Sequence, residues 1–415
     1  MKTKVGIEAM AIAVPRRYVD LEDLARARGV DPAKYTAGLG GREMMVADPG
    51  EDSASLAATA AARLLRNNNV DPRRIGMLVV GTETAVDHSK AVASHVQGLL
   101  QLPRSMRVFD TQHACFGGTA GLMAAAEWIA SGVGAGKAAL VIATDIARYE
   151  RLSPGEPTQG GAAVAMLVSQ RPDVLALDLG LNGVSSADVY DFWRPIGRRE
   201  AVVDGHYSIS CYLDALTGAY RGWRELAVEK EVIRAGSTLP SEQLDRILYH
   251  VPFCKMAKKA HAQVRRCDLE DQNPSLVWSD ELDAQARSAE NYAKQVAPSL
   301  TLNTRVGNAY TASLYLALAG LLNEQGEDLA TRRIGLFSYG SGSCAEFFSG
   351  VVSEGAAHRL ANAEIETVMA ARERISIEEY EKVLASHQPE EEAKPAPGTF
   401  RLGAIKEHRR VYLTG

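Results

Sequence analysis

One local pattern occurs twice in this chain, and it constrains the fold more than any other feature. An apolar, strand-like run ends in polar residues, and later a helix of small residues opens on a polar side chain. The first half has the run 75–81 before Glu83 and a helix after Cys115; the second has 246–250, ending in His250, and a helix opening at Asn308. Two such halves packed back to back bring these four side chains to one central site. Short apolar runs alternating with Ala-rich helices predict a layered α/β fold.

The expected strands follow from short apolar runs bounded by turn residues. They are Val5–Ala13, Ile75–Gly81, Met106–Phe109, Ala138–Ala143, Ala162–Val168, Val174–Leu179, Arg246–His250, Ile334–Tyr339 and Ala345–Val352. Helices are expected to begin after Asp20, with Asp23 completing a capping box, after Asp31 with Pro32 at the first position, and after Asp52.

The chain divides by composition into four parts. Residues 1–170 and 241–388 form the two repeated halves, and residues 171–240 lack the strand–helix rhythm and are interpreted as an insertion and connecting segment. Residues 389–415 are interpreted as a proline-rich linker and a short tail, because the stretch 388–398 is polar and rich in proline.

Composition excludes several classes of protein. The 415 residues carry a net charge of −5, so no basic surface for nucleic acid is expected. No run of about 18 apolar residues predicts a membrane span, and the N-terminal residues do not resemble a signal peptide. Five cysteines, without a zinc-type CxxC pair, predict reduced thiols and a cytoplasmic protein with no metal site.

Cys115 is the candidate nucleophile. It stands between a short β-like run and a helix of small residues, with Gly117 and Gly118 directly after it. Unpaired N–H groups at a helix N-terminus favour a thiolate, so we expect an activated thiol able to carry an acyl group. The alternative is a small buried side chain without chemistry, as most free cysteines are.

Glu83 and His250 are the candidate acid–base groups. Glu83 follows a strongly apolar strand, and burial there raises the pKa of a carboxyl group toward neutrality. His250 holds the corresponding strand-end position in the second half. The alternatives are a solvated loop glutamate and a structural histidine.

Two further polar features accompany these residues. Lys255 and Lys259 lie four residues apart, so they share a helix face that binds one phosphate group or is simply solvated. The turn Ser338-Tyr-Gly-Ser-Gly-Ser343 lies between two apolar strands; it is either a plain hairpin or a loop whose backbone N–H groups face an oxyanion.

Taken together, collinear segments from Val5 to about Val352 closely resemble the 3-hydroxy-3-methylglutaryl-CoA (HMG-CoA) synthase family of thiolase-fold condensing enzymes. The segments include Val80-Gly-Thr-Glu83, Ala114-Cys115-Phe-Gly-Gly, Gly155-Glu-Pro-Thr158, Asp188-Val-Tyr-Asp-Phe-Trp-Arg-Pro195, Val203-Asp204-Gly-His-Tyr-Ser208, Tyr249-His250-Val-Pro-Phe-Cys-Lys255, Val306-Gly-Asn308 and Phe337-Ser-Tyr-Gly-Ser341. The resemblance implies a five-layer αβαβα sandwich of two duplicated halves, usually a homodimer.

The resemblance also implies a mechanism. Cys115 takes the acetyl group of acetyl-CoA, Glu83 removes a methyl proton, and the resulting enolate attacks acetoacetyl-CoA, whose ketone His250 polarises. Water then releases HMG-CoA, which feeds mevalonate and isoprenoid synthesis. The only small molecules implied are the CoA thioesters; no metal or redox cofactor is expected. The substrate-contacting or cavity-shaping residues implied are Tyr149, Thr158, Asp204, Ser208, Lys255, Lys259, Asn308 and Ser341, with Asp145 as another cavity-shaping residue.

Three other interpretations remain open at this point. An HMG synthase of polyketide β-branching shares the chemistry but takes its acetyl group from an acyl-carrier protein. A non-catalytic thiolase-fold scaffold is disfavoured by the intact Cys115, Glu83 and His250. Other condensing enzymes of this fold typically lack the glutamate, so Glu83 discriminates against them.

Overall fold

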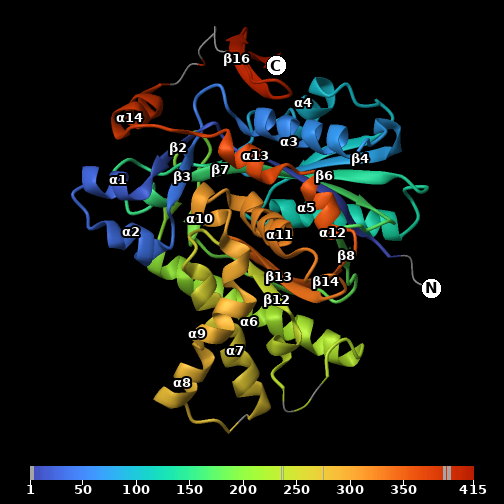
Figure 1. The fold of residues 1–415 in the computed structure, drawn as a ribbon, viewed down its shortest axis with the longest axis vertical. Coiled ribbons are helices and arrows are strands. Elements are labelled where there is room, and N and C mark those ends of the chain that lie inside the picture. Colours follow the sequence, from blue (N-terminus) through green and yellow to red (C-terminus); the bar gives the residue numbers. More distant parts are fainter. Residues whose placement is uncertain (1–3, 235, 237, 274, 387–388, 390–393) are drawn as a thin grey trace.

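The computed structural model describes residues 4–415 except 235, 237, 274, 387–388 and 390–393. Its elements stack in five layers, helix–sheet–helix–sheet–helix, and three apolar cores fill the spaces between the layers (Figure 1). The expected αβαβα sandwich is therefore confirmed.

The first half contributes strands of nearly continuous apolar sequence, as strands covered on both faces require. Their order in the sheet is β1-β7-β6-β4-β5, with β4 parallel to both β5 and β6 and the β1–β7 and β6–β7 pairs antiparallel. Their bounds are β1 (Gly6–Ala13), β4 (Ile75–Gly81), β5 (Arg107–Thr111), β6 (Ala138–Ala147) and β7 (Gly160–Ser169). The edge of this sheet is β5.

The second half contributes the order β12-β13-β14-β8, with β9 beside β14. The short β8 pairs with both β14 and β1, so it links the two sheet layers through hydrogen bonds into one continuous path of ten strands. The expected hairpin between the apolar runs is confirmed, because Gly340 pairs with Cys344 across a tight turn. The bounds are β8 (Leu175–Leu177), β9 (Gly183–Ser186), β12 (Arg246–Tyr249), β13 (Arg333–Gly340) and β14 (Cys344–Val352).

Helices α5 (Gly117–Ala130) and α11 (Ser313–Gln325) form the middle layer, in one apolar core with strands of both halves. The outer layers are α3 (Ser53–Asn67) and α4 (Val92–Leu99) on the first half, and α6 (Gly205–Glu229) and α7 (Met256–Gln272) on the second (Figure 1). The small residues of α5 allow close packing, since a Cβ at Gly118 would lie 2.7 Å from the Cβ of Ala143.

The segment 171–240 is part of this core. It supplies β8, β9 and α6, and α6 buries Tyr220 and Trp223 against Phe347 of β14. The strand–helix rhythm is weak here because β8 and β9 have only three and four residues. The exact domain boundaries stay predictions.

The expected helix starts are confirmed. Asp20, Asp31 and Asp52 each accept backbone N–H groups of the helix that follows. The predicted capping box at Asp20 is wrong, because the carboxylate of Asp23 does not bind the Asp20 N–H and pairs with Arg26 and Arg374 instead.

The C-terminal residues form a hairpin that packs on α3. The expected linker at 389–398 falls partly on residues 390–393, which lie outside the described part. After it, β16 (Phe400–Lys406) and β17 (Arg409–Thr414) pair antiparallel. The hairpin is held by the Phe400 N–H on Thr59 (3.1 Å) and by the Tyr412 hydroxyl on Asp52 (2.9 Å).

The remaining elements surround this core. They are β2 (Arg17–Asp20), β3 (Glu43–Val46), β10 (Phe192–Trp193), β11 (Val202–Val203), β15 (Glu373–Arg374), α1 (Leu21–Ala27), α2 (Pro32–Leu39), α8 (Asp280–Ala286), α9 (Ala289–Gln295), α10 (Asn303–Val306), α12 (Ala356–Ala361), α13 (Ile365–Ala370) and α14 (Ile377–Ala385).

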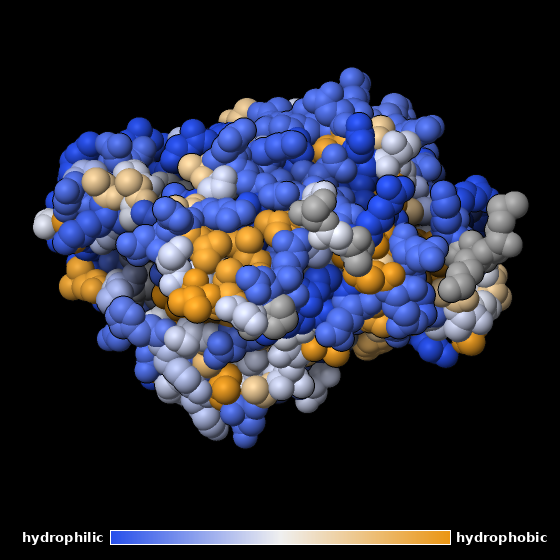
Figure 2. All heavy atoms as spheres, turned by 90° about the horizontal axis from the view of Figure 1, so that it is seen from below, coloured by the Kyte–Doolittle hydropathy of each residue, from blue (hydrophilic) through white to orange (hydrophobic). Residues whose placement is uncertain are grey.

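Seen from below, the surface is mostly hydrophilic around a compact apolar area (Figure 2). Within the described residues, no helix is both long and apolar enough to cross a membrane.

Candidate active site

A cavity of about 200 Å³ lies where the two halves meet. Its wall combines apolar side chains such as Phe253 and Met256 with a few polar groups, as small-molecule sites usually do. The predicted residues that line it are Cys115, Tyr149, Thr158, Ser208, His250, Asn308 and Ser341. The structure therefore brings together residues that are up to 226 positions apart in sequence, from Cys115 to Ser341.

Cys115 lies just before the middle-layer helix α5. The helix begins at Gly117, and a turn with Ala114 at φ +40° delivers the thiol to the cavity. The Phe116 N–H donates to the His113 carbonyl (2.9 Å) and the Gly118 N–H to the Thr311 hydroxyl (2.6 Å), so the start of the helix is fixed from both halves.

The prediction that Cys115 is a thiolate before it reacts is wrong. Burial, and then the carboxylates of Glu83 and Asp145, raise the pKa of the Cys115 thiol well above its ordinary value. These effects outweigh the helix terminus, because negative charge lies next to the sulfur. The thiol consequently needs a proton acceptor when it reacts, and its Sγ donates a hydrogen bond to Oε1 of Glu83 at 3.4 Å.

Glu83 has the raised pKa that its strand-end position predicted. Burial, followed by the nearby Asp145 carboxylate, raises its pKa to about 8. The charge of Arg194 acts in the opposite direction, and the Arg194 guanidinium also donates to the Glu83 carbonyl oxygen. A carboxyl group with a pKa near neutrality is suited to both accepting and returning a proton.

Asp145 holds the backbone of this acid in place. Its Oδ1 accepts the N–H groups of Glu83 and Thr84, both at 2.9 Å, and the Thr82 hydroxyl at 2.8 Å. Its Oδ2 accepts the Thr311 N–H from the second half (3.2 Å). This buried carboxylate therefore orients Glu83 and joins it to the loop before α11.

His250 is fixed through its backbone and faces the cavity with its ring. Its N–H donates to the Phe337 carbonyl and its carbonyl accepts the Tyr212 hydroxyl, both at 2.8 Å. Burial lowers the pKa of His250 to about 3, so the imidazole is neutral at physiological pH. Its buried Nδ1 has no partner among the described residues, which leaves it to a ligand or water.

Asn308 and Thr158 join the two halves across the cavity. The Asn308 N–H donates to the Thr158 carbonyl at 2.9 Å. The Asn308 Oδ1 accepts the Tyr310 N–H (2.8 Å), which fixes the amide plane. Tyr149 packs edge-on against Tyr310, and burial raises the pKa of its hydroxyl, which stays protonated.

Asp191 is a site residue that was not singled out from sequence. It is buried and accepts the Tyr339 hydroxyl (2.7 Å), the Gly342 N–H (2.9 Å) and the Ser208 hydroxyl (3.3 Å). It thereby fixes the loop that carries Ser341. The signal was present, because Asp191 falls in the segment 188–195 that carries the family resemblance.

Five predicted residues lie outside the cavity wall; of these, Glu83 contacts the lining residue Cys115 and Asp145 holds Glu83, whereas Lys255, Lys259 and Asp204 lie on the surface. Lys255 and Lys259 are exposed at the start of α7, and the Lys255 Nζ donates to the Ala37 carbonyl (3.0 Å). Asp204 is exposed and caps α6 by accepting the Tyr207 N–H (3.2 Å). The described residues contain no cluster of three or more His, Cys, Asp or Glu side chains that could hold a metal ion.

Comparison with known families matches both halves of the chain. Residues 1–173 match the model for the N-terminal part of hydroxymethylglutaryl-coenzyme A synthase, and residues 175–412 match the model for its C-terminal part. The chain belongs to the hydroxymethylglutaryl-CoA synthase family. It is therefore a condensing, acyl-transferring enzyme. Of the three residues predicted to be catalytic, Cys115 and His250 line one cavity, and Glu83 contacts Cys115.

Individual relatives agree with this assignment. The hydroxymethylglutaryl-CoA synthase of Enterococcus faecalis is 37% identical over 92% of this chain and 91% of its own, and the human mitochondrial enzyme is 35% identical over 98% and 89%. A solved structure of MvaS in complex with 3-hydroxy-3-methylglutaryl coenzyme A is 67% identical, covers both chains fully and superposes with a TM-score of 0.98. The curacin-pathway HMG synthase with an acetyl donor carrier protein is 31% identical, with a TM-score of 0.85 over 99% of this chain and 100% of its own.

Proposed function

We propose that this enzyme condenses acetyl-CoA with acetoacetyl-CoA and water, and releases HMG-CoA and CoA through an acetyl-Cys115 intermediate. The observation that carries the proposal is the hydrogen bond of 3.4 Å from the Cys115 Sγ to Glu83. Cys115 lines the same cavity as His250 and Asn308. The cavity thus combines a nucleophile that has an adjacent proton acceptor with polar groups for a second substrate.

The first step forms the acetyl-enzyme. The Cys115 sulfur attacks the acetyl carbonyl, and its proton passes to the adjacent Glu83. The bond between the carbonyl carbon and the CoA sulfur then breaks, and Glu83 gives the proton to the departing thiolate, so that CoA leaves as the free thiol and Glu83 is again a carboxylate. Because burial raises the pKa of the thiol and little thiolate exists beforehand, an adjacent proton acceptor speeds this step.

The second step forms the new carbon–carbon bond. Glu83 takes a proton from the thioester methyl group, and the enolate carbon attacks the ketone carbon of acetoacetyl-CoA. The ketone oxygen becomes an alkoxide and takes up the proton that Glu83 removed from the methyl group, either directly or by way of His250. Because His250 is neutral, it polarises the ketone by donating a hydrogen bond rather than by carrying a charge.

The last step hydrolyses the Cys115 thioester. Water attacks the carbonyl carbon, the carbon–sulfur bond breaks, and the sulfur regains a proton. We propose that backbone N–H groups at Cys115 and near Ser341 stabilise the oxyanion, since both residues line the cavity.

We propose that the remaining lining residues, Tyr149, Thr158, Ser208 and Asn308, contact the acyl and pantetheine portions of the substrates. Lys255 and Lys259 lie beside Met256, which lines the cavity, so they can reach the CoA phosphates from outside. For Asp204 the structure favours an indirect role, because it caps the helix that carries Ser208.

CoA is the proposed handle of the acetyl donor rather than an acyl-carrier protein. The relative that shares 67% identity is bound to HMG-CoA, whereas the structure with a donor carrier protein shares 31%. Incubation with acetyl-CoA and acetoacetyl-CoA, followed by mass spectrometry, is expected to yield HMG-CoA. Faster product formation from an acetylated carrier protein would favour the alternative, and no product from either donor would contradict the proposal.

We further propose a cytoplasmic homodimer that supplies mevalonate and isoprenoid synthesis and needs no resident cofactor. The five cysteines are free, as expected in a reducing compartment. The edge strand β5 offers backbone groups on its outer side, which a second copy can pair. Light scattering coupled to gel filtration tests the dimer.

A further inference from the structure

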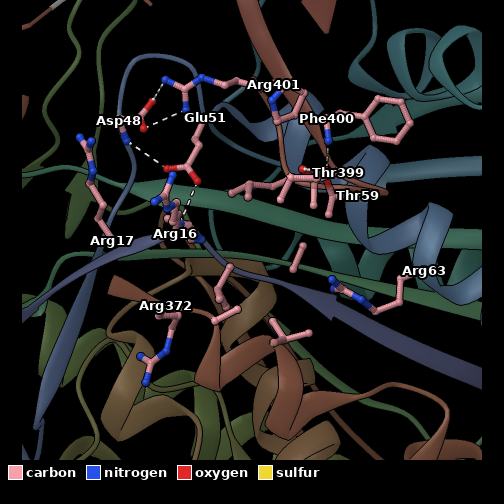
Figure 3. Close-up of a pocket in the computed structure, with 18 of the residues that line it drawn as sticks. Arg16, Arg17, Asp48, Glu51, Thr59, Arg63, Arg372, Thr399, Phe400 and Arg401 are labelled. Atoms are coloured by element: carbon pink, nitrogen blue, oxygen red, sulfur yellow. Dashed lines mark hydrogen bonds and ion pairs between the residues drawn. The ribbon is translucent and has the colours of Figure 1, made fainter. Parts of the chain in front are cut away.

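Two C-terminal segments pack on the first half of the chain, and one of them is connected to the active site. The hairpin β16–β17 contacts α3, where the Phe400 N–H donates to Thr59 (Figure 3). Among the described residues, the cavity beside that hairpin shares no lining residue with the active-site cavity. Helix α14 lies beside α1 (Figure 1), and its Tyr380 is connected to the active-site cavity through the buried side chain of Gln159.

The connection begins where the pairing of β6 with β7 ends. The last pair of this ladder is Ala147 with Gly160. The N–H groups beyond it lack a strand partner, and a buried N–H group needs an acceptor. For Tyr149 the acceptor is the side chain of Gln159, whose Oε1 lies 2.9 Å from the Tyr149 nitrogen. Gln159 is buried, so little water competes for this bond.

The other end of the amide fixes Gln159 in turn. Its Nε2 donates to the Tyr380 hydroxyl (2.8 Å), and that hydroxyl donates to Oε1 of Glu156 (3.2 Å). All three side chains are buried. The amide therefore has one orientation, because its oxygen accepts from Tyr149 and its nitrogen donates to Tyr380. This chain of hydrogen bonds holds the backbone of Tyr149 relative to α14.

Tyr149 forms part of the wall around the candidate nucleophile. Its ring lies edge-on to Phe192 and to Tyr310, with 6.4 Å between the ring centroids in both pairs. Phe192 and Tyr310 also pack edge-on, at 5.6 Å. The three rings belong to one apolar cluster with Cys115, and all four residues line the cavity. The rings therefore bound the space in which a group attached to the sulfur lies.

We propose that Gln159 and Tyr380 are positioning residues for Tyr149, and that the ring so placed selects acetyl thioesters over longer acyl thioesters. This inference rests on the proposed function, in which Cys115 carries the acyl group. An added methylene in a closely packed site forces the wall to move, and a ring on a loosened backbone moves more easily. Neither positioning residue lines the cavity, so both act through Tyr149.

Competition between acetyl-CoA and propionyl-CoA tests the proposal. The full-length protein is incubated briefly with equal concentrations of both, and intact-protein mass spectrometry gives the ratio of acetylated to propionylated enzyme. We expect the unaltered enzyme to favour the acetyl group about tenfold or more, because a pocket discriminates one methylene by about 10–200-fold. The variants Gln159→Met and Tyr380→Phe are each expected to lower this ratio about threefold or more, since a displaced wall loses part of that discrimination.

The matched control is Tyr220→Phe, which removes a buried hydroxyl that donates to Asp268 (2.7 Å) and lies outside the cavity. This control is expected to keep the ratio even where it lowers the melting temperature, because a hydrogen bond lost elsewhere does not move the wall. Tyr380→Phe keeps the aromatic ring of α14, so its result stands even if Gln159→Met folds poorly.

A double variant tests the route through Tyr149. In the Tyr149→Ala background, Gln159→Met is expected to leave the ratio unchanged, because the ring that it positions is gone. The proposal is overturned if either positioning variant folds and keeps the ratio of the unaltered enzyme, if Tyr220→Phe lowers the ratio equally, or if the double variant falls below Tyr149→Ala alone. Absence of any acyl group on the unaltered enzyme would instead refute the proposed function, and this inference with it.

Discussion

Gly81, the last residue of β4, touches the backbone of Gly118 in α5, so that a Cβ on Gly81 would lie 2.3 Å from the Gly118 nitrogen. Glu83 follows Gly81 by two residues, and Cys115 precedes Gly118 by three. This glycine contact therefore sets how closely the carboxyl group approaches the thiol.

Replacing Gly81 with Ala is expected to push α5 away from β4 and lower kcat at least about tenfold, since an ångström of misplacement is costly in catalysis. Steady-state rates and the rate of acetylation measure this effect. The control is Gly98→Ala in α4, where a Cβ meets nothing within 4 Å. That control is expected to keep full activity and gain about 0.5–1 kcal/mol of stability. Equal activity in both variants would contradict the packing argument.

Replacing Glu83 with Gln is expected to stabilise the fold while it abolishes condensation. Burial raises the pKa of Glu83 to about 8, above the value of 4.5 for an unperturbed glutamate. The folded state therefore holds a proton that the unfolded state releases, and stability falls as pH rises from 4.5 to about 8. The Gln variant lacks this loss, so its advantage in unfolding free energy grows with pH and exceeds about 1 kcal/mol at pH 8, since one pKa unit is about 1.4 kcal/mol. Urea unfolding at pH 6 and pH 8 measures it; an advantage that shrinks with pH would refute the assignment.

Replacing His250 with Ala is expected to raise KM for acetoacetyl-CoA about tenfold or more, with a smaller effect on acetylation of Cys115, because the imidazole serves the second substrate. Since burial lowers the pKa of His250 to about 3, the unaltered enzyme is expected to show no ionisation of this residue between pH 5 and 8. The control is His358→Ala, which alters an exposed histidine of α12 outside the cavity. An unchanged KM in the His250 variant would remove this residue from the proposed role.

A buried ion pair supports the loop that carries Thr158. The Arg28 side chain is 7% exposed and lies 2.8 Å from Glu156, which is 1% exposed, and 2.8 Å from Glu381. Replacing Arg28 with Met is expected to cost about 3–5 kcal/mol of unfolding free energy, because the buried Glu156 loses its charged partner and keeps only the Leu152 N–H and the Tyr380 hydroxyl. Replacing the neighbouring Arg26 with Met removes an exposed ion pair with Glu22. This change is expected to cost less than about 1 kcal/mol of unfolding free energy. Similar melting temperatures for the two variants would contradict this view.

Much of the core could be predicted because local signals agreed with one another. Apolar runs predicted the main strands, and Asp20, Asp31 and Asp52 capped their helices. The duplicated pattern placed Cys115, His250 and Asn308 on one cavity, with Glu83 in contact with Cys115. These features depend on the spacing of residues along the chain, which can be read from the sequence alone.

Other features depend on contacts between distant residues. The protonated state of Cys115 results from burial and from Glu83, 32 positions away, so the helix terminus alone predicted the wrong charge. Asp191 acquires its role through Tyr339 and Gly342, and the hairpin β16–β17 through Thr59 and Asp52. Asp204 lies near the site in sequence but serves as a helix cap.

The central claim is that Cys115 carries the acetyl group while Glu83 acts in the condensation that follows. Intact-protein mass spectrometry after brief incubation with acetyl-CoA tests it directly, in the unaltered enzyme and in the variants Cys115→Ala, Glu83→Gln and, as a thiol control, Cys267→Ala, which alters a buried cysteine outside the cavity. We predict a covalent acetyl group on the unaltered enzyme and on Cys267→Ala, a more slowly formed one on Glu83→Gln, which lacks the adjacent proton acceptor, and none on Cys115→Ala; after addition of acetoacetyl-CoA we predict its loss from all acetylated forms except Glu83→Gln. Acetylation of Cys115→Ala, or normal turnover of acetyl-enzyme in Glu83→Gln, would contradict the account.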